Sequence, residues 1–370
     1  MERALARVDL GAVRANCARL RAELGRAELC AVVKADGYGH GAVACAEAAL
    51  AGGATRLAVA TAAEARGLRE AGIGAPLLAL GALSAAELDV ALAAGAEVSV
   101  WREGFLRLVA ERARARGAPA RVHVKLDSGM GRLGNPDPGE VLALARACAA
   151  DPDLELAGVW THFATADEPG ADEGYFDLQL QRFDAVAAAV KAEFPAAIAH
   201  AANSAAVFRD RRSHHDMARC GVAVYGLDPF QVDPAERGLA PALSLRSYLA
   251  DVKRFPAGQS AGYGRTWRAP RETWVGVVPI GYGDGVRRAL GNRAEALVGG
   301  RRRPLVGTVS MDNVTVDLGP ETEARPGDEV VLIGRQGEEE VRAEEWARIL
   351  GTINYEVTCG ITARVPRRPA

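Results

Sequence analysis

A lysine stands where a strongly apolar run of the chain ends. Lys34 directly follows the segment CAVV (residues 30–33). An amine at the end of a buried strand is partly removed from water, which lowers its pKa below the ordinary value of about 10.4 and makes it available for imine chemistry. The same position also suits a lysine that extends its ammonium group to the surface, so position alone leaves both roles open.

Polar residues also follow other apolar runs of the chain. They are Lys125, Asp127, His162, Asn203, Ser204 and Arg219, the last of which is followed by Gly221 and Val222. The Ser204 hydroxyl and the backbone N–H groups near Gly221 are groups that bind phosphate, although Ser204 could equally cap the helix expected after it. A phosphate-binding loop near a strand-end lysine suggests pyridoxal phosphate as the cofactor.

Eight short apolar runs of β type alternate with Ala- and Leu-rich helical segments between residues 29 and 225. The runs begin at Leu29, Arg56, Pro76, Glu97, Arg121, Leu154, Ala197 and Met217. Eight β-α units within about 200 to 250 residues are what an α/β fold of the (β/α)₈ TIM-type barrel requires, and its active site lies where the strands end. The glycine-rich segment 37–41 could instead be a dinucleotide-binding loop, but the G-x-G-x-x-G spacing is absent.

The pattern changes after Leu239 to β-rich segments separated by turn residues. We expect the barrel over residues 8–235 and a second, mostly β C-terminal domain over residues 236–370, with the Pro- and Asp-rich segment 227–238 at the join. The segment AEEWARILG (343–351) is expected to be a single late helix. The N-terminal strand expected in residues 1–7 could belong to either domain.

The composition excludes several classes of protein. The 370 residues are 49% hydrophobic and 25% charged, with a net charge of -2. These values are typical of a globular protein, and the short arginine clusters lack the interleaved aromatic residues of a nucleic-acid-binding surface. The six cysteines are scattered without metal-type spacing, so we expect free thiols and no metal site. No signal-peptide core or membrane span is found, so we expect a cytoplasmic protein that binds no membrane.

The segments that contain the polar residues closely resemble alanine racemase. In the first half they are AVVKADGYGHG (31–41), HVKLDSGMGRLG (123–134), WTHFATADE (160–168), HAANSAA (200–206) and ARCGVAVYGL (218–227). In the second half they are AGYGRTW (261–267), PIGYGDG (279–285), GTVSMDN (307–313) and INYEVTCGITARVPR (353–367). The resemblance covers both domains in order. It implies an isomerase that interconverts L-alanine and D-alanine and supplies D-alanine for peptidoglycan in the cell wall.

The resemblance also implies roles for individual residues. Lys34 would hold pyridoxal phosphate as a Schiff base and act as one catalytic base, with Tyr263 as the base on the opposite face. Two opposed bases suit racemisation, which removes Hα from one face of the substrate and returns a proton to the other. Arg219 would face the pyridine nitrogen and keep it unprotonated. The other implied cofactor contacts are Tyr38, His162, Asn203, Ser204, Gly221, Val222 and Tyr355.

Further residues match positions that the family uses for the substrate. Arg132 and Met311 match contacts to the substrate carboxylate, the first by its charge and the second by its backbone N–H. Tyr282 and Asp312 match neighbours that narrow the entrance. Lys125 resembles a lysine that is carbamylated in the family, and the added carboxylate would orient the arginine.

The family resemblance further implies a head-to-tail homodimer with shared active sites. The β domain of one subunit would deliver Tyr263 and Met311 to the barrel of the other. Cys220 departs from the bulkier residue or proline expected between the arginine and the glycine, which puts the local backbone contact in doubt.

Other functions share parts of this pattern. A broad-specificity amino-acid racemase would differ only in the shape of its substrate pocket. A basic amino-acid decarboxylase has the same domains and cofactor, but it expects an acidic partner for the pyridine nitrogen in place of Arg219. A non-catalytic pyridoxal-phosphate carrier resembles the barrel alone. A cofactor-free Schiff-base aldolase would use Ser204, Gly221 and Arg219 to hold a substrate phosphate.

Overall fold

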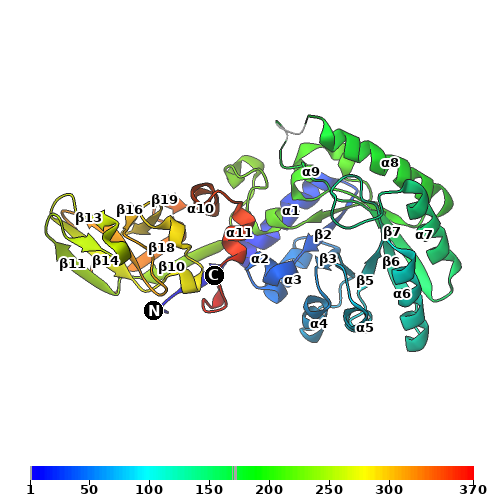
Figure 1. Ribbon diagram of the computed structural model, residues 1–370, viewed down its shortest axis with the longest axis horizontal. Helices are drawn as coiled ribbons and strands as arrows, with labels where there is room; N and C mark the ends of the chain where they lie inside the picture. Colours follow the sequence, from blue (N-terminus) through cyan, green and yellow to red (C-terminus); the bar gives the residue numbers. More distant parts are fainter. Residues whose placement is uncertain (1, 169, 171–172) are drawn as a thin grey trace. The chain divides into compact units, whose positions relative to one another are not determined.

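The computed structural model of the chain describes residues 2–168, 170 and 173–370, which form two compact units (Figure 1). The barrel unit comprises Val13–Gly37 and Ala42–Val224. The β unit comprises the residues up to Ala12, the short piece Tyr38–Gly41 and the segment Tyr225–Ala370. The β unit therefore includes four residues of the loop that follows Lys34. Met1, the first residue of the expected N-terminal strand, lies outside the described residues.

Eight parallel strands form the wall of the barrel unit within the described residues. Their order in the sheet is β8-β7-β6-β5-β4-β3-β2-β9. They are β2 (Glu28–Val32), β3 (Arg56–Val59), β4 (Leu77–Ala79), β5 (Glu97–Val100), β6 (Ala120–Lys125), β7 (Leu154–Trp160), β8 (Ile198–His200) and β9 (Met217–Cys220). Backbone hydrogen bonds from Asp216 N to Ala199 O (3.0 Å) and from Arg219 N to Ala202 O (2.9 Å) bridge the two ends of this order. The expected barrel is confirmed.

Helices lie outside the ring of strands (Figure 1). They include α1 (Leu10–Leu24), α3 (Ala42–Ala51), α4 (Ala62–Glu70), α5 (Ala85–Ala93), α6 (Glu103–Arg116), α7 (Pro138–Ala150), α8 (Tyr175–Glu193) and α9 (Ser204–Arg209). Helix α4 illustrates how local sequence sets them. Thr61 and Glu64 form a capping box at its start, and Ala62, Ala65 and Leu68 recur at helical spacing and are buried.

The second unit is built on a large, mainly antiparallel sheet. Its main path runs β11-β14-β17-β16-β15-β18-β10-β1-β20. These strands are β1 (Leu5–Val8), β10 (Leu243–Tyr248), β11 (Asp251–Phe255), β14 (Thr273–Val278), β15 (Glu295–Val298), β16 (Arg301–Val306), β17 (Val314–Gly319), β18 (Glu329–Gln336) and β20 (Arg367–Pro369). Strand β1 pairs with β10 and β20, so the N-terminal segment belongs to this sheet. The mostly β character expected for the C-terminal half is confirmed.

The expected late helix is present as α10 (Ala343–Leu350), which buries Trp346 and Ala347 and ends at Gly351, where φ is 69°. That segment forms one helix as expected, and a second short helix, α11 (Asn354–Cys359), follows it. With only six residues, α11 is too short to show helical periodicity in the sequence. No described helix combines the length and the apolar character that crossing a bilayer requires.

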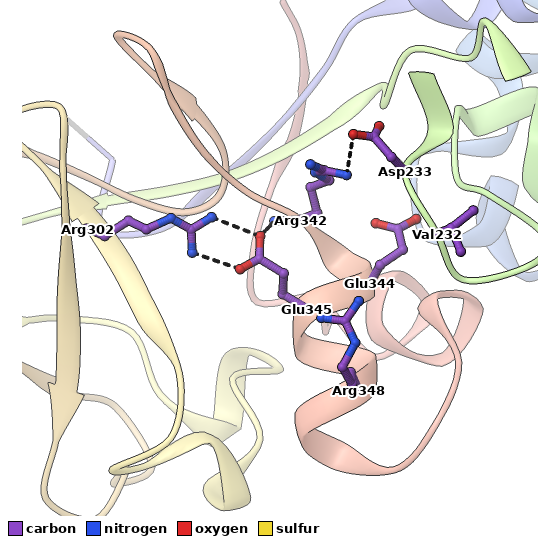
Figure 2. Close-up of a pocket in the computed structure, with 7 residues that line it drawn as sticks. All are labelled: Val232, Asp233, Arg302, Arg342, Glu344, Glu345 and Arg348. Atoms are coloured by element: carbon purple, nitrogen blue, oxygen red, sulfur yellow. Dashed lines mark hydrogen bonds and ion pairs between the residues drawn. The ribbon is translucent and has the colours of Figure 1, made fainter. Parts of the chain in front are cut away.

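A surface pocket of about 410 Å³ lies beside α10 in the β unit (Figure 2). Arg302 on β16 donates to Glu345 on α10 at 2.8 Å, and Arg342 pairs with Asp233 at 2.8 Å. Because these charged groups pair with one another, the pocket wall ties α10 to the sheet and to the segment before β10.

Candidate active site

The turn that carries Lys34 has an unusual backbone. Strand β2 ends at Val32, and the residues Ala35–Tyr38 have φ values of 52°, 51°, 62° and 53°. Residues other than glycine rarely adopt positive φ, and such strain persists where the surrounding structure holds it, often at functional sites. Gly37 N donates to Val33 O at 2.9 Å and closes the turn around Lys34.

Two carboxylates hold this turn in place. Glu64 Oε1 accepts a hydrogen bond from Ala35 N at 2.7 Å, while Oε2 of the same residue accepts one from Ala60 N at 2.8 Å. Asp36 Oδ1 accepts a hydrogen bond from Ala42 N at 2.8 Å. Because Glu64 also belongs to the capping box of α4, one side chain fixes both the start of that helix and the turn of Lys34.

Basic side chains gather around the imidazole of His162, which follows β7. Burial lowers the pKa of His162 well below its usual range, and nearby positive charges lower it further. Those charges belong to Arg219, Arg132, Lys125 and Lys34. These four basic residues thus act on one buried imidazole, and such a concentration of positive charge favours an anionic ligand.

Lys125 is the last residue of β6 and is only 3% exposed. Burial, and after it the charges of Arg219 and Arg132, lowers the pKa of Lys125 to about 7. Near neutral pH about half of a group with that pKa is therefore an uncharged amine, which is the nucleophilic form.

Arg219 is buried on β9, with its guanidinium group held by backbone carbonyls. It donates to Thr161 O at 2.8 Å, to His200 O at 3.0 Å and to Ala201 O at 3.1 Å, in each case from Nη1 or Nη2. Burial lowers the pKa of Arg219 to about 10, so the group stays charged at neutral pH. Within the described residues no acceptor faces its Nε–H, which leaves that donor for a ligand.

The loops after β8 and β9 form a polar cradle beside the loop after β2. Asn203 caps α9 by accepting a hydrogen bond from Ala206 N at 2.9 Å. The alternative that Ser204 is the cap is therefore wrong, because Asn203 occupies the N-cap position and Ser204 is the first residue of the helix. Ser204 Oγ instead accepts from Gly221 N at 3.0 Å. The parallel pairing of β2 with β9 makes this loop a neighbour of the Lys34 turn.

Two further expected residues border the cradle or lie within it. Val222 begins the short 3₁₀ helix Val222–Tyr225, and Ala223 N also donates to Ser204 Oγ at 3.4 Å. Cys220 is fully buried, and the contact between Ser204 and Gly221 forms with a cysteine at that position.

Tyr263 projects from the β unit and is 72% exposed in the single chain. Its backbone is tied down, since Thr308 Oγ1 donates to Tyr263 O at 2.8 Å. Gly262 has φ of 70°, and a Cβ there would lie 2.9 Å from Thr308 N, so glycine lets the two loops approach. A cavity of about 400 Å³ adjoins Tyr263, Thr308 and Ser310.

The loops of Tyr282 and Met311 are joined backbone to backbone. Tyr282 N donates to Ser310 O at 3.0 Å, and Gly283 N donates to Met311 O at 2.9 Å. A Cβ on Gly281 would lie 2.3 Å from Ser310 O, so only glycine permits this approach. Met311 is 52% exposed, and Tyr263, Tyr282 and Met311 thus lie on loops of the β unit that contact one another.

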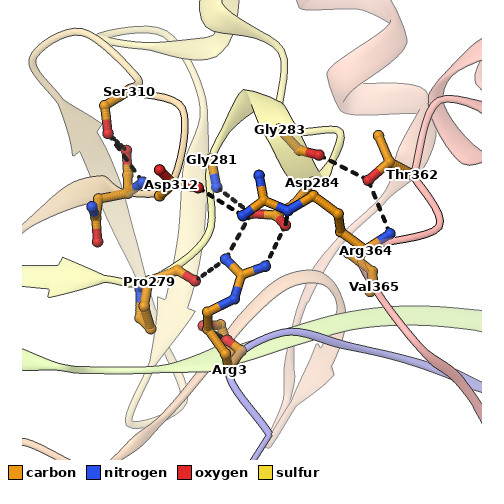
Figure 3. A network of polar contacts seen from close by, with 12 residues as sticks. Arg3, Pro279, Gly281, Gly283, Asp284, Ser310, Asp312, Thr362, Arg364 and Val365 are labelled. Atoms are coloured by element: carbon orange, nitrogen blue, oxygen red, sulfur yellow. Dashed lines mark hydrogen bonds and ion pairs between the residues drawn. The ribbon is translucent and has the colours of Figure 1, made fainter.

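A buried carboxylate braces these loops (Figure 3). Asp284 accepts hydrogen bonds from Arg3 Nη1 at 2.9 Å and from Gly281 N at 3.0 Å. Burial raises the pKa of Asp284, but the hydrogen bonds from Arg3 and Gly281 and the charge of Arg364 outweigh it and lower the pKa. Arg364 also donates to Asp312 at 2.7 Å, which links the expected entrance residue to the same network.

The two tyrosines expected at the phosphate lie close together in the β unit. The ring centroids of Tyr38 and Tyr355 are 6.1 Å apart. The ring centroid of Tyr225 lies 5.2 Å from that of Tyr38 and 4.6 Å from that of His40. An aromatic cluster therefore surrounds the piece of chain that follows Lys34.

Sequence reasoning missed several buried partners of the expected residues. The indole of Trp160, at the end of β7, has the Arg219 guanidinium carbon 4.6 Å from its ring centre. His123 shares one face of β6 with Lys125, a relation that the two-residue period of a strand could have revealed. The link of Glu64 to the Lys34 turn left no signal in the sequence, because it joins residues 29 positions apart.

Comparisons with known proteins agree across the whole chain. The family model for the alanine racemase N-terminal domain matches residues 8–229, and the model for the C-terminal domain matches residues 242–369. The chain is 46% identical over 363 residues to the alanine racemase of Symbiobacterium thermophilum, covering 98% of this chain and 96% of that protein. It is 44% identical over 371 residues to that of Frankia casuarinae, covering 99% and 96%.

Solved structures give the same result. The fold matches a crystal structure of alanine racemase from Streptomyces lavendulae with a TM-score of 0.94 and 40% identity, covering 100% of this chain and 97% of that one. The match to alanine racemase from Streptomyces coelicolor has a TM-score of 0.93 and 39% identity, and it covers 99% of this chain and 98% of that one.

Proposed function

The chain belongs to the alanine racemase family and is an isomerase that interconverts L-alanine and D-alanine, and we propose that it does so with pyridoxal phosphate bound covalently to Lys34. The observation that carries the proposal is the position of Lys34 in a strained strand-end turn beside the Ser204 and Gly221 cradle. D-Alanine made in this way would serve the synthesis of peptidoglycan.

The residues present fit this cofactor. The Ser204 hydroxyl and the N–H groups that begin the segment Val222–Tyr225 are donors that a phosphate requires, and Tyr38 and Tyr355 would add phenol hydroxyls. The unused Nε–H of Arg219 is suited to the pyridine nitrogen, and His162 and Asn203 would line the ring. The positive charges around His162 match an anionic cofactor and an anionic substrate carboxylate.

Pyridoxal phosphate supplies an electron sink that acidifies Hα of the bound amino acid. The protein must then move that proton between two faces. Lys34 would remove or return it on one face, and Tyr263 would do the same on the other. Because each base serves one enantiomer, both directions of the reaction need both residues.

Arg219 would limit side reactions. A guanidinium that stays charged is a poor proton donor, so it keeps the pyridine nitrogen unprotonated and restrains the electron sink. A basic amino-acid decarboxylase needs an acidic group at that place, so this function is not favoured. A broad-specificity racemase is not favoured either, since the relatives are named alanine racemases.

Arg132 would bind the substrate carboxylate by charge, and the Met311 N–H would bind it by a hydrogen bond. Tyr282 and Asp312, braced by Asp284 and Arg364, would narrow the entrance. Lys125 is suited to carbamylation because its amine is partly neutral near pH 7, and the carbamate would orient Arg132.

We further propose a homodimer in which the partner subunit's Tyr263 and the partner subunit's Met311 complete each barrel site. The high exposure of both side chains in the single chain supports this arrangement. A cytoplasmic location fits the synthesis of D-alanine from an intracellular amino acid.

The test of function is a substrate panel. Purified protein with added pyridoxal phosphate is incubated with single L-amino acids, and D-enantiomer formation is followed by chiral chromatography. L-Alanine should be converted fastest, and D-alanine should be converted back. Release of carbon dioxide from lysine or arginine in place of racemisation would overturn the proposal.

A further inference from the structure

Four buried side chains form a continuous line of hydrogen bonds through the barrel. Glu97 Oε2 lies 2.7 Å from His123 Nε2, His123 Nδ1 lies 2.9 Å from His200 Nε2, and His200 Nδ1 lies 2.8 Å from Arg219 Nη1. None of the four is more than 4% exposed. Glu97 begins β5 and Arg219 lies near the end of β9, so the line runs from the N-terminal ends of the strands toward the active-site end.

A glycine makes room for this line. His123 on β6 and His200 on β8 are separated by β7, and Gly158 is the β7 residue paired with His123. A Cβ on Gly158 would lie 2.6 Å from His123 Nδ1, the atom that bonds to His200. The sheet therefore leaves a space that the hydrogen bond between the two imidazoles fills.

The ends of the line determine where its protons lie. Arginine has only N–H donors, so His200 Nδ1 must be an acceptor and His200 must carry its proton on Nε2. That proton is donated to His123 Nδ1, and His123 must then carry its own proton on Nε2 and donate to Glu97. Both imidazoles are neutral, because a second proton on either would set two donors against each other.

Glu97 is suited to its end of the line. Burial raises the pKa of Glu97, but the hydrogen bond from His123 and the charges of Arg56 and Arg121 outweigh it and bring the pKa to about 2. The carboxylate is therefore charged and can only accept. Burial also lowers the pKa values of His123 and His200, in agreement with two neutral rings.

We infer that Glu97 is a positioning residue for Arg219: acting through His123 and His200, it selects the imidazole tautomers that hold the Arg219 guanidinium in its plane. This inference rests on the proposed function, in which the Arg219 Nε–H faces the cofactor. If His200 Nδ1 no longer accepts a hydrogen bond from Arg219 Nη1, the guanidinium group would tilt and expose the pyridine nitrogen to protonation. The ratio of transamination to racemisation would then rise.

Glu97→Gln should reverse the donor and acceptor roles along the line of hydrogen bonds. Arg121 Nε and Arg56 Nη1 donate to Glu97 Oε1 at 2.8 and 3.0 Å, whereas Oε2 has only the longer arginine contact of 3.2 Å to Arg56 Nη1, so we expect the amide oxygen of glutamine at the Oε1 position. The amide NH₂ group must then face His123 Nε2 and donate to it. Each imidazole moves its proton to Nδ1, and His200 Nδ1–H meets the Arg219 N–H, two donors in conflict.

The matched control is Glu155→Gln. Glu155 also pairs with Arg121, at 2.7 Å, but it is half exposed and lies outside the line. The substitution removes the same charge from the same arginine. Gly158→Ala is a second test, since its Cβ would lie 2.6 Å from His123 Nδ1 and 2.5 Å from Ile198 O, and so displaces the imidazole without changing any charge.

The measurement is a long-range ¹H–¹⁵N correlation spectrum of the holoenzyme with ¹⁵N-labelled histidine, of which the chain has six residues. The signals of His123 and His200 are assigned by their loss in His123→Gln and His200→Gln. We expect both rings to be neutral and protonated on Nε2 in the wild type and in Glu155→Gln. The Glu97→Gln spectrum should show protonation on Nδ1. An Nδ1 proton or a charged ring in the wild type would overturn the inference, whatever the fate of the variants.

The second readout is the ratio of pyridoxamine formation to racemisation with L-alanine. It should rise several-fold in Glu97→Gln and Gly158→Ala and stay unchanged in Glu155→Gln. Unchanged ratios in both line variants would leave a buried network without a positioning role and so refute the inference. A wild type that does not racemise alanine would instead refute the proposed function, while the tautomers would still report on the line itself.

Discussion

The Lys125 Nζ atom lies 4.0 Å from the ring centre of Trp160. Because the pKa of Lys125 is lowered to about 7, a fraction of the protein carries a neutral amine at this buried site near neutral pH. We predict that the amine reacts with carbon dioxide, forming a carbamate and releasing a proton. Protein equilibrated with ¹³C-bicarbonate should show a bound ¹³C signal that is lost in Lys125→Ala and kept in Lys253→Ala. A signal that survives in Lys125→Ala would place the modification elsewhere.

The same pKa predicts a pH dependence of stability. The pKa of Lys125 falls from 10.5 in the unfolded chain to about 7 in the folded one, so the unfolded state binds more protons between these values. In carbonate-free buffer, stability should therefore rise with pH across this window, and the destabilisation should be complete below about pH 7. Lys125→Met should remove this part of the dependence in urea unfolding. Equal slopes for the two proteins would contradict the lowered pKa of Lys125.

Ser204→Ala should weaken binding of pyridoxal phosphate. In the proposed site the hydroxyl would donate to a phosphate oxygen, and hydrogen bonds to charged groups contribute about 1.5–3 kcal/mol, or about tenfold or more in affinity. Fluorescence titration of the apoenzyme gives the dissociation constant. Ser213→Ala is the control, since the hydroxyl of that buried serine is committed to backbone oxygens, to Asp210 O at 2.7 Å and to Ala206 O at 3.3 Å. Equal affinities of the two variants would exclude Ser204 from the phosphate site.

Tyr263→Phe should reduce racemisation by about 10²–10⁴-fold, because it removes the hydroxyl that transfers a proton. Cofactor binding should be unchanged. Exchange of Hα with deuterium from solvent, followed by NMR, should survive better for one enantiomer of alanine than for the other. Near wild-type exchange from both enantiomers would rule out the two-base assignment.

Lys34→Ala and Tyr263→Ala proteins should complement each other if each site joins two subunits. One site of a mixed dimer then receives both lesions, and the other is intact. With random pairing about half of the dimers are mixed, so activity should return to about a quarter of the wild-type value. Differential tagging is used to show that mixed dimers form. If they form and activity stays at background, single chains hold complete sites.

The sequence predicted the architecture well because barrel strands are buried on both faces. Each therefore reads as a short apolar run, and all eight expected runs coincide with strands, including the one at Met217. The polar residues at their ends could be placed on one face of the barrel from the same pattern.

Other features could not be read from the sequence, for physical reasons. The left-handed backbone at Ala35 is accompanied by a hydrogen bond from Ala35 N to Glu64, and alanine does not signal positive φ. The contacts of His123 with Glu97 and His200 require the four strands β5, β6, β7 and β8 to lie side by side, which the sheet order of the folded barrel provides. The roles of the site residues remain predictions.

The most direct test of the central claim is borohydride reduction of the holoenzyme, followed by peptide mapping. The lysines of the chain are Lys34, Lys125, Lys191 and Lys253, so a reduced pyridoxyl group can be assigned to one of four positions. We predict that it lies on Lys34 and that Lys34→Ala abolishes interconversion of L-alanine and D-alanine. A pyridoxyl group on Lys125 or Lys253, or a Lys34→Ala protein that still racemises alanine, would contradict the account.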